Sequence, residues 1–456
     1  MYSLYRTEPK ARMIAIIPHT FSADNAESIQ SIGLDTLVVK ASSVLDITEI
    51  WHLIPTTVNK LVYFSTEIMF QKNVDHYFAY VAHTSLKNSK DMVGLQVLER
   101  RQNFTLLSET FPMADQEVHW FHGPMKPWTV HHYRGVDWQN YYNPLPFYHW
   151  RQLHDELALE KGETPQWINQ DRRRLVCGSN TDMMAPKILD QFSVLLSTYN
   201  PERIQHLQLL IQHLLTSTQI HKVFVTWHNP HLDVPDALLQ MGERVTILKQ
   251  SYDSLNNRFN PANAIETEAV YIMDDDILMD IQDIEFTFEV WRLNKDSIVG
   301  HFPRLHGYNP ETHKGSYIIP NDGEAYSMIL TKSMFTRTDY LFAYTCLLDK
   351  QLHYDIDERT NCEDIAFNLM VSGMTAAKSI AVIPAKPVID YGGDKGISIS
   401  GHHMQERREC VERFITEYWD TVDPLIISHS AVVRRVGPII QKGKWDNMQA
   451  DISSLV

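Results

Sequence analysis

The chain has 456 residues, of which 44% are hydrophobic. This is longer than a domain with a single hydrophobic core usually is, so we expect two domains of about 150 to 250 residues. Its formal net charge of −15 argues against a nucleic-acid partner, because binding a phosphate backbone requires a basic surface. Four cysteines are too few for a disulfide scaffold and lack the paired spacing of a zinc site, although one pair can still be bridged.

Residues 1–185 form the first predicted domain, an α/β domain with a weaker pattern than the rest of the chain. Within it, the segment 62–68 and a glycine at 94 are similar to the segment 270–277 and a glycine at 300. This similarity leaves two interpretations open. The first domain is a degenerate, non-catalytic repeat of the second that has lost most of its carboxylates, or the two strand-turn segments match by chance.

Residues 186–456 form the second predicted domain, which begins with alternating strands and helices. Short, apolar and partly β-branched runs predict strands at 192–197, 222–227, 245–249 and 269–273. After the first strand, Asn200 suits a helix N-cap and Pro201 the first helical position. Such a β-α-β series predicts a mostly parallel sheet covered on both faces, with ligands at the carboxyl ends of its strands.

Three consecutive aspartates, Asp274, Asp275 and Asp276, directly follow the last of these strands. Adjacent carboxylates at a strand end repel one another and resist desolvation unless a cation neutralises them. Mn²⁺ or Mg²⁺ suits such a site, because these ions take one or two carboxylates and leave the rest of their shell to phosphate oxygens. Aspartate triplets also occur in helix caps and solvated loops, so the position after an apolar strand is what favours a metal site.

From Phe192 to Val436 the sequence resembles the exostosin-like glycosyltransferases, a family of α-N-acetylhexosaminyltransferases. The resemblance rests on several short segments that occur in the same order. They are Ser197-Thr-Tyr-Asn200, Thr226-Trp-His-Asn229, Asn257-Arg-Phe259, the aspartate triplet, Val299-Gly-His-Phe-Pro-Arg304, Tyr326-Ser-Met-Ile-Leu330, Asn361-Cys-Glu-Asp-Ile-Ala-Phe-Asn368 and His403-x3-Arg407-x2-Cys410-x3-Phe414. The resemblance implies a GT-A fold for 186–456, preceded by an α/β domain that is GT-A-like if it is a degenerate repeat.

The same resemblance implies a reaction. It is the metal-dependent, retaining transfer of a hexosamine, above all N-acetylglucosamine from UDP-GlcNAc, in α linkage to a glycan or glycolipid acceptor. The acceptor hydroxyl then enters on the face that the diphosphate leaves, so the departing phosphate oxygen can take the proton. Asp364 would orient a substrate and stabilise positive charge at the anomeric carbon, and Arg407 would stabilise the leaving phosphate. A helix N-cap is the alternative role for Asp364.

The family's donor-binding positions carry over residue by residue. The family often has an arginine directly after its Tyr-Asn pair, whereas here Pro201 intervenes and Arg203 is the nearest candidate. Arg258 suits the diphosphate, because a guanidinium forks onto two phosphate oxygens; a surface arginine is the alternative. Asp274 and Asp276 are the expected metal ligands. The full predicted donor-binding set is Thr198, Tyr199, Asn200, Arg203, Asn229, Asn257, Arg258, Asp274 and Asp275.

The resemblance pairs Cys362 with Cys410 in a disulfide. Such a bond would restrict the unfolded chain by roughly 3 to 5 kcal/mol and would bring Asp364 next to Arg407. Because disulfides persist in an oxidising compartment, it favours the lumen of the Golgi or the endoplasmic reticulum. The membrane anchor usual for the family is not visible in the sequence, since no run of about 18 apolar residues occurs. Three explanations for the missing anchor stay open: the chain is a trimmed form, its gene prediction is incomplete, or it reaches its compartment by a different route.

Two other functions stay open. The chain could be a catalytically inactive glycan-binding or assembly partner of another glycosyltransferase, or a phosphotransfer enzyme that uses the aspartates for Mg²⁺ alone. The latter has poor support, because no glycine loop that binds phosphate precedes a lysine. The expected partners are a UDP-sugar donor and a glycan or glycolipid acceptor. A homo-oligomer, or a hetero-oligomer with other glycosyltransferases, is left open.

Overall fold

The computed structural model describes residues 121, 123–167, 173–179, 187–392, 402–435 and 439–455, together with the backbone of the short strands β1 to β8 before residue 121. Contacts divide the chain into two compact units, Met1–Lys126 with Glu156–Glu163 and Pro127–Asp155 with Thr164–Val456. The predicted domain boundary at 185/186 lies outside the described residues and stays a prediction.

The described strands of the first unit form small sheets. They are the parallel pair β1 (Ile14–Pro18) and β2 (Asp35–Val39), the antiparallel sheet β3 (Lys60–Phe64), β6 (Leu95–Arg100), β7 (Leu106–Thr110) and β5 (Thr84–Ser85), and the antiparallel pair β4 (Ile68–Phe70) and β8 (Val118–Trp120). Strand β3 contains the beginning of the segment 62–68. Residues 65–67 and 94, which complete the proposed repeat, lie outside the described residues, so the duplication stays a prediction.

The second unit contains an eight-stranded mixed sheet. Its strands, in order across the sheet, are β11 (Val245–Lys249), β10 (Ile220–Trp227), β9 (Ile188–Thr198), β12 (Thr267–Asp274), β18 (Ser333–Arg337), β14 (Val299–Gly300), β19 (Ile380–Ile383) and β21 (Val432–Val433). The four predicted strands are confirmed, and they pair in parallel with one another. Together they make up one side of the sheet.

Strand β18 departs from the expected parallel arrangement, since it runs antiparallel to both β12 and β14. The connection from β14 to β18 contains the strands β15 (Pro303–Asn309), β16 (Lys314–Ile318) and β17 (Met328–Ile329). It has no helix, and a helical crossover is what parallel neighbours usually need. The antiparallel pairing places the residues just before β18 beside the carboxyl end of β12.

The turn after β9 follows its sequence signals. The Asn200 side chain accepts a hydrogen bond of 3.0 Å from the Glu202 backbone N–H, and Pro201 begins the 3₁₀ turn η5 (Pro201–Arg203). Helix α6 (Ile204–Leu214) follows and buries Leu207, Leu210, Ile211 and Leu214 in the core shared with β9. The cap predicted at Asn200 and Pro201 is therefore confirmed, and together with the buried helix face it fixes the strand end that carries Thr198.

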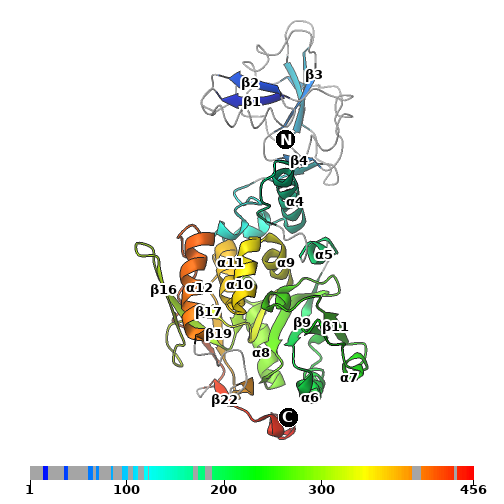
Figure 1. The fold of residues 1–456 in the computed structure, drawn as a ribbon, viewed down its shortest axis with the longest axis vertical. Coiled ribbons are helices and arrows are strands. Elements are labelled where there is room, and N and C mark those ends of the chain that lie inside the picture. The colour runs from blue at the N-terminus through cyan, green and yellow to red at the C-terminus, as the bar shows by residue number, and fades with distance from the viewer. Residues whose placement is uncertain are drawn as a thin grey trace. The chain divides into compact units, whose positions relative to one another are not determined.

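The helices that follow β18 pack on one another in the second unit (Figure 1). They are α9 (Thr338–Leu347), α10 (Lys350–Arg359), α11 (Glu363–Thr375) and α12 (His403–Tyr418). The other elements are η3 (Val130–His132), η4 (Trp138–Asn140), α4 (Pro144–Glu160), α5 (Arg173–Ser179), α7 (Asp236–Leu239), η6 (Leu255–Phe259), α8 (Ile281–Arg292), η9 (Trp445–Asn447), α13 (Met448–Leu455) and the small sheet β13 (Ile277–Leu278), β20 (Val388–Asp390) and β22 (Ile440–Lys442).

Two disulfides join these helices. Cys362 at the start of α11 is bonded to Cys410 on α12, with Cα atoms 6.4 Å apart, so the predicted pair is confirmed. Cys177 on α5 is bonded to Cys346 on α9, with Cα atoms 5.8 Å apart. This second bridge was not predicted from the sequence. Its cysteines lie 169 residues apart, and only the packing of α5 against α9 brings them together.

Candidate active site

A cavity of about 710 Å³ opens where β9, β10 and β12 end. The strand ends contribute Ser197 to Asn200, His228 and the three aspartates. The opposite wall comes from η6, from the connection before β18, and from the beginnings of α11 and α12. Binding sites of α/β sheets lie at this edge, as the sequence predicted.

Asp275 is held by two protein partners in the cavity wall. Its Oδ2 accepts a hydrogen bond of 2.7 Å from Thr198 Oγ1, and its Oδ1 lies 2.8 Å from Arg203 Nη1. Burial raises the pKa of Asp275, although Arg203 and Thr198 oppose this by favouring the charged form. Pro201 therefore does not remove an arginine from this end of the cavity, because Arg203 reaches it from the last position of η5.

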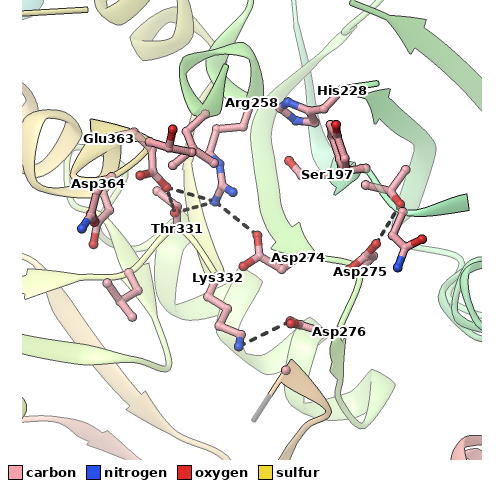
Figure 2. Close-up of a pocket in the computed structure, with 18 of the residues that line it drawn as sticks. Ser197, His228, Arg258, Asp274, Asp275, Asp276, Thr331, Lys332, Glu363 and Asp364 are labelled. Carbon is pink, nitrogen blue, oxygen red and sulfur yellow. Dashed lines mark hydrogen bonds and ion pairs between the residues drawn. The ribbon is translucent and has the colours of Figure 1, made fainter. Parts of the chain in front are cut away.

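Arg258 bridges two parts of the site (Figure 2). Its Nη1 lies 3.2 Å from Asp274 Oδ1 and 3.5 Å from Glu363 Oε1, and it donates a hydrogen bond of 2.7 Å to Thr331 Oγ1. Burial lowers the pKa of Arg258, but Asp274 and Glu363 more than offset this, so the guanidinium stays charged. The surface role considered for Arg258 is thus wrong, because the side chain is buried between these carboxylates.

Asp276 faces a lysine that the sequence analysis did not consider (Figure 2). Lys332 Nζ lies 3.4 Å from Asp276 Oδ1 and donates hydrogen bonds of 2.9 and 3.1 Å to the Asp390 carboxylate. Burial raises the pKa of Asp276 to about 7, although the Lys332 charge opposes the rise. The Asp276 carboxylate is therefore costly to ionise while no other cation is present.

Asp364 and Arg407 form a separate charged pair in the cavity wall. Arg407 donates from Nη2 to Asp364 Oδ2 and from Nη1 to Asn361 Oδ1 at 3.0 Å, and its guanidinium lies 4.6 Å from the centre of the Tyr317 ring. The adjacency expected from the disulfide is confirmed. Asp364 lies within α11, whose N-cap residue is Cys362 without a side-chain cap, so the alternative N-cap role of Asp364 is wrong.

Asp274 and Asp276 fit a divalent metal ion only in part. Within the described residues, no three His, Cys, Asp or Glu side chains group closely enough to hold a metal by themselves. Asp274 and Asp276 each keep a buried Oδ1 that accepts no hydrogen bond from any described residue. Two such oxygens beside an open cavity suit Mg²⁺ or Mn²⁺, which take few protein ligands and complete their shell with substrate phosphate.

Not every predicted donor residue lines the cavity. Thr198, Tyr199, Asn200 and Arg203 do, whereas Asn229 and Asn257 do not. Asn229 Oδ1 accepts a hydrogen bond of 3.1 Å from the His231 backbone N–H, and Asn257 Nδ2 donates one of 2.7 Å to the Tyr252 carbonyl. These side chains stabilise the turns next to the cavity, and their direct contact with a donor stays a prediction.

Several lining residues were missed by the sequence reasoning. His228 and Glu363 lie inside segments that carried the resemblance, so position in those segments was an available signal. Burial lowers the pKa of His228 to about 4, which keeps its imidazole neutral at pH 7. Lys332 and its partner Asp390 had no such signal, because only the register of β18 against β12 and the position of β20 bring them to Asp276.

Buried arginines and aspartates meet in a cavity at the strand ends of a large mixed α/β sheet. Together with the sequence comparisons, they define the class of protein as a glycosyltransferase. Residues 192–435 match the glycosyl transferase family 64 domain. The chain belongs to this family, and the exostosin-like resemblance is confirmed.

Relatives support the same assignment. The chain is 32% identical over 274 residues to Glycosyltransferase family protein 64 C3 of Arabidopsis thaliana, which covers 54% of this chain and 81% of that protein. It is 32% identical over 256 residues to Exostosin-2 of Mus musculus, covering 55% of this chain and 34% of that protein. It is 28% identical over 247 residues to Glycosylinositol phosphorylceramide mannosyl transferase 1 of Arabidopsis thaliana, and this match covers 50% of this chain and 72% of that protein. The match therefore spans about one third of Exostosin-2.

Proposed function

We propose that this chain is a metal-dependent, retaining glycosyltransferase of GT-A fold that transfers N-acetylglucosamine from UDP-GlcNAc in α linkage to a glycan or glycolipid. The observation that carries the proposal is the single cavity in which the aspartate triplet and the Asp364–Arg407 pair both lie. The aspartate triplet suits a nucleotide diphosphate with its metal ion, and the Asp364–Arg407 pair suits the reacting sugar.

The protein groups have separable tasks in this proposal. Asp274 and Asp276 hold Mn²⁺ or Mg²⁺, which supplies charge neutralisation for the diphosphate when bound. Arg258 and Arg407 bring permanent positive charge to the cavity wall, where they stabilise the phosphate that leaves. Asp364, whose Oδ1 accepts no hydrogen bond from a described residue, stabilises positive charge at the anomeric carbon. The proton of the acceptor hydroxyl passes to the departing phosphate oxygen.

The donor sugar is the least constrained part of the proposal. One relative is named as a mannosyl transferase, and another, 31% identical over 242 residues, is Glucosamine inositolphosphorylceramide transferase 1 of Arabidopsis thaliana. Both names concern inositol phosphorylceramide glycolipids, which supports a glycolipid among the acceptors to be tried. N-acetylglucosamine stays the first choice because the resemblance in sequence implies a hexosamine.

Two disulfides support the lumen of the Golgi or the endoplasmic reticulum as the compartment, because such bonds persist where the environment is oxidising. None of the helices in the described parts of the chain has the length and apolarity needed to cross a membrane.

A panel of nucleotide sugars tests the proposed function. The purified protein is incubated with UDP-GlcNAc, UDP-GalNAc, UDP-glucosamine and GDP-mannose, with Mn²⁺ or with chelator, and nucleotide release is measured. We expect Mn²⁺-dependent release of UDP from UDP-GlcNAc. Release of GDP would move the donor to mannose. Absence of both release and UDP binding would favour an inactive glycan-binding or assembly partner.

Metal binding is expected to depend on pH. Because the pKa of Asp276 is raised to about 7, a proton competes with the metal below that pH, and the carboxylate is free to bind above it. The affinity for Mn²⁺ without nucleotide should therefore be about tenfold weaker at pH 6 than at pH 8. Calorimetric titration at the two pH values measures this. Equal affinities at the two pH values would show that no proton on Asp276 competes with the metal.

A further inference from the structure

Lys332 lines the cavity and lies between two carboxylates, those of Asp276 and Asp390. It makes two hydrogen bonds to Asp390, at 2.9 and 3.1 Å, and its Nζ lies 3.4 Å from Asp276 Oδ1. Its backbone is fixed as well, because the Lys332 carbonyl accepts a hydrogen bond of 3.2 Å from the Asp274 N–H. The ammonium is therefore held near Asp276 by contacts that need no ligand.

The surroundings leave this ammonium little freedom to move away. Asp390 also accepts a hydrogen bond of 2.9 Å from the Gly392 N–H, which fixes the carboxylate that holds Lys332. A Cβ atom on Gly392 would overlap Asp276 Oδ2 and lie 3.1 Å from Lys332 Nζ, so the chain packs closely around the pair. The Lys332 side chain is 21% exposed and lines the cavity.

The charges at this end of the cavity are unequally matched. Asp275 has Arg203 as a close partner, and Asp274 has Arg258, which it shares with Glu363. Among the described residues, Asp276 has its ion pair with Lys332 alone, which it shares with Asp390, and its Oδ1 accepts no hydrogen bond there. Asp276 thus keeps enough negative charge to bind a cation but has a positive charge beside it that opposes one.

We infer that Lys332 makes metal binding at Asp276 conditional on the donor's diphosphate. The inference rests on the proposed function. A divalent ion bound alone at Asp276 is repelled by the adjacent ammonium, so its affinity is low. A diphosphate that enters with the ion brings negative charge that both the ion and Lys332 attract. The ion and the nucleotide therefore bind cooperatively, and Lys332 is a positioning residue that supplies part of that coupling.

A thermodynamic cycle tests this inference. The affinity for Mn²⁺ is measured by calorimetry or electron paramagnetic resonance at pH 8.0, with and without saturating UDP, in the wild-type protein and in Lys332→Met. We expect Lys332→Met to bind Mn²⁺ alone about tenfold more tightly than wild type, because the repulsion is gone. The gain in Mn²⁺ affinity on adding UDP should shrink by a similar factor.

A second variant covers the case in which Lys332→Met leaves Asp390 unpaired and the protein folds poorly. Lys332→Met with Asp390→Asn removes the pair together, and it should still bind Mn²⁺ alone more tightly than wild type does. Lys332→Arg keeps the positive charge and should bind Mn²⁺ alone as weakly as wild type. Lys295→Met is the matched control, because it removes an ammonium paired with Glu268, at the opposite end of β12 from Asp274.

The inference would be overturned if Lys332→Met and the double variant Lys332→Met with Asp390→Asn both bound Mn²⁺ alone no more tightly than wild type does. Wild-type protein that binds no UDP, with or without Mn²⁺, would instead contradict the proposed function. The two failures are distinguishable, because the first is measured without nucleotide and the second with it.

Discussion

Replacing Asp276 with asparagine should lower glycosyl transfer by about 10³-fold or more, because a lost metal ligand removes several kcal/mol of charge stabilisation from the transition state. Asp276 differs from Asp275 in its contacts. Both Asp275 oxygens are engaged by Thr198 and Arg203, whereas Asp276 Oδ1 accepts no hydrogen bond from a described residue. Initial rates with UDP-GlcNAc at saturating Mn²⁺ measure the effect.

The same substitution should leave the melting temperature of the metal-free protein unchanged or slightly higher. Burial raises the pKa of Asp276 to about 7, so the ionised carboxylate destabilises the folded state relative to the unfolded chain. A neutral side chain of the same shape avoids that cost. Replacing a functional group that destabilises the folded state often has this effect. Asp233→Asn is the matched control, because Asp233 is fully exposed and pairs only with Lys249 among the described residues. A large fall in melting temperature with Asp276→Asn would assign Asp276 a structural role.

Replacing Asp364 with asparagine should lower kcat by about 10²- to 10³-fold while the affinity for UDP stays nearly constant. Asparagine keeps the size of the side chain and can still accept a hydrogen bond from Arg407, so the geometry of the pair is largely preserved. What is lost is the negative charge, which in the proposed mechanism acts on the anomeric carbon only as the glycosidic bond breaks. Steady-state kinetics and calorimetry with UDP separate the two effects.

A parallel loss of UDP affinity would contradict this role and would make Asp364 a residue that merely builds the donor site through Arg407. Glu409→Gln provides the control for charge on the same helix as Arg407. Glu409 lies on α12 and pairs with Arg359 at 3.1 Å near the surface, away from the residues that line the cavity. Its neutralisation should leave both kcat and UDP binding unchanged.

The sequence by itself determined the local elements around the site and the family. The strands β9, β10, β11 and β12 were predicted because their apolar, β-branched runs are short and continuous, and the turn after β9 because Asn200 and Pro201 specify it. The aspartate triplet could be placed at a strand end from the same pattern. Segments spread over the second half of the chain identified the exostosin-like family, and with it the Cys362–Cys410 bond.

Only the tertiary structure decided which side chains meet the aspartates. Lys332 reaches Asp276 because β18 pairs antiparallel with β12, with Ser333 opposite Met273, and Asp390 reaches Lys332 from a different sheet. The Cys177–Cys346 bond depends in the same way on helices distant in the chain. Propensity and periodicity describe each segment by itself, whereas strand register and helix packing depend on contacts between segments far apart in sequence. The acidic site was therefore visible in the sequence, and the charged groups that lie next to Asp276 were not.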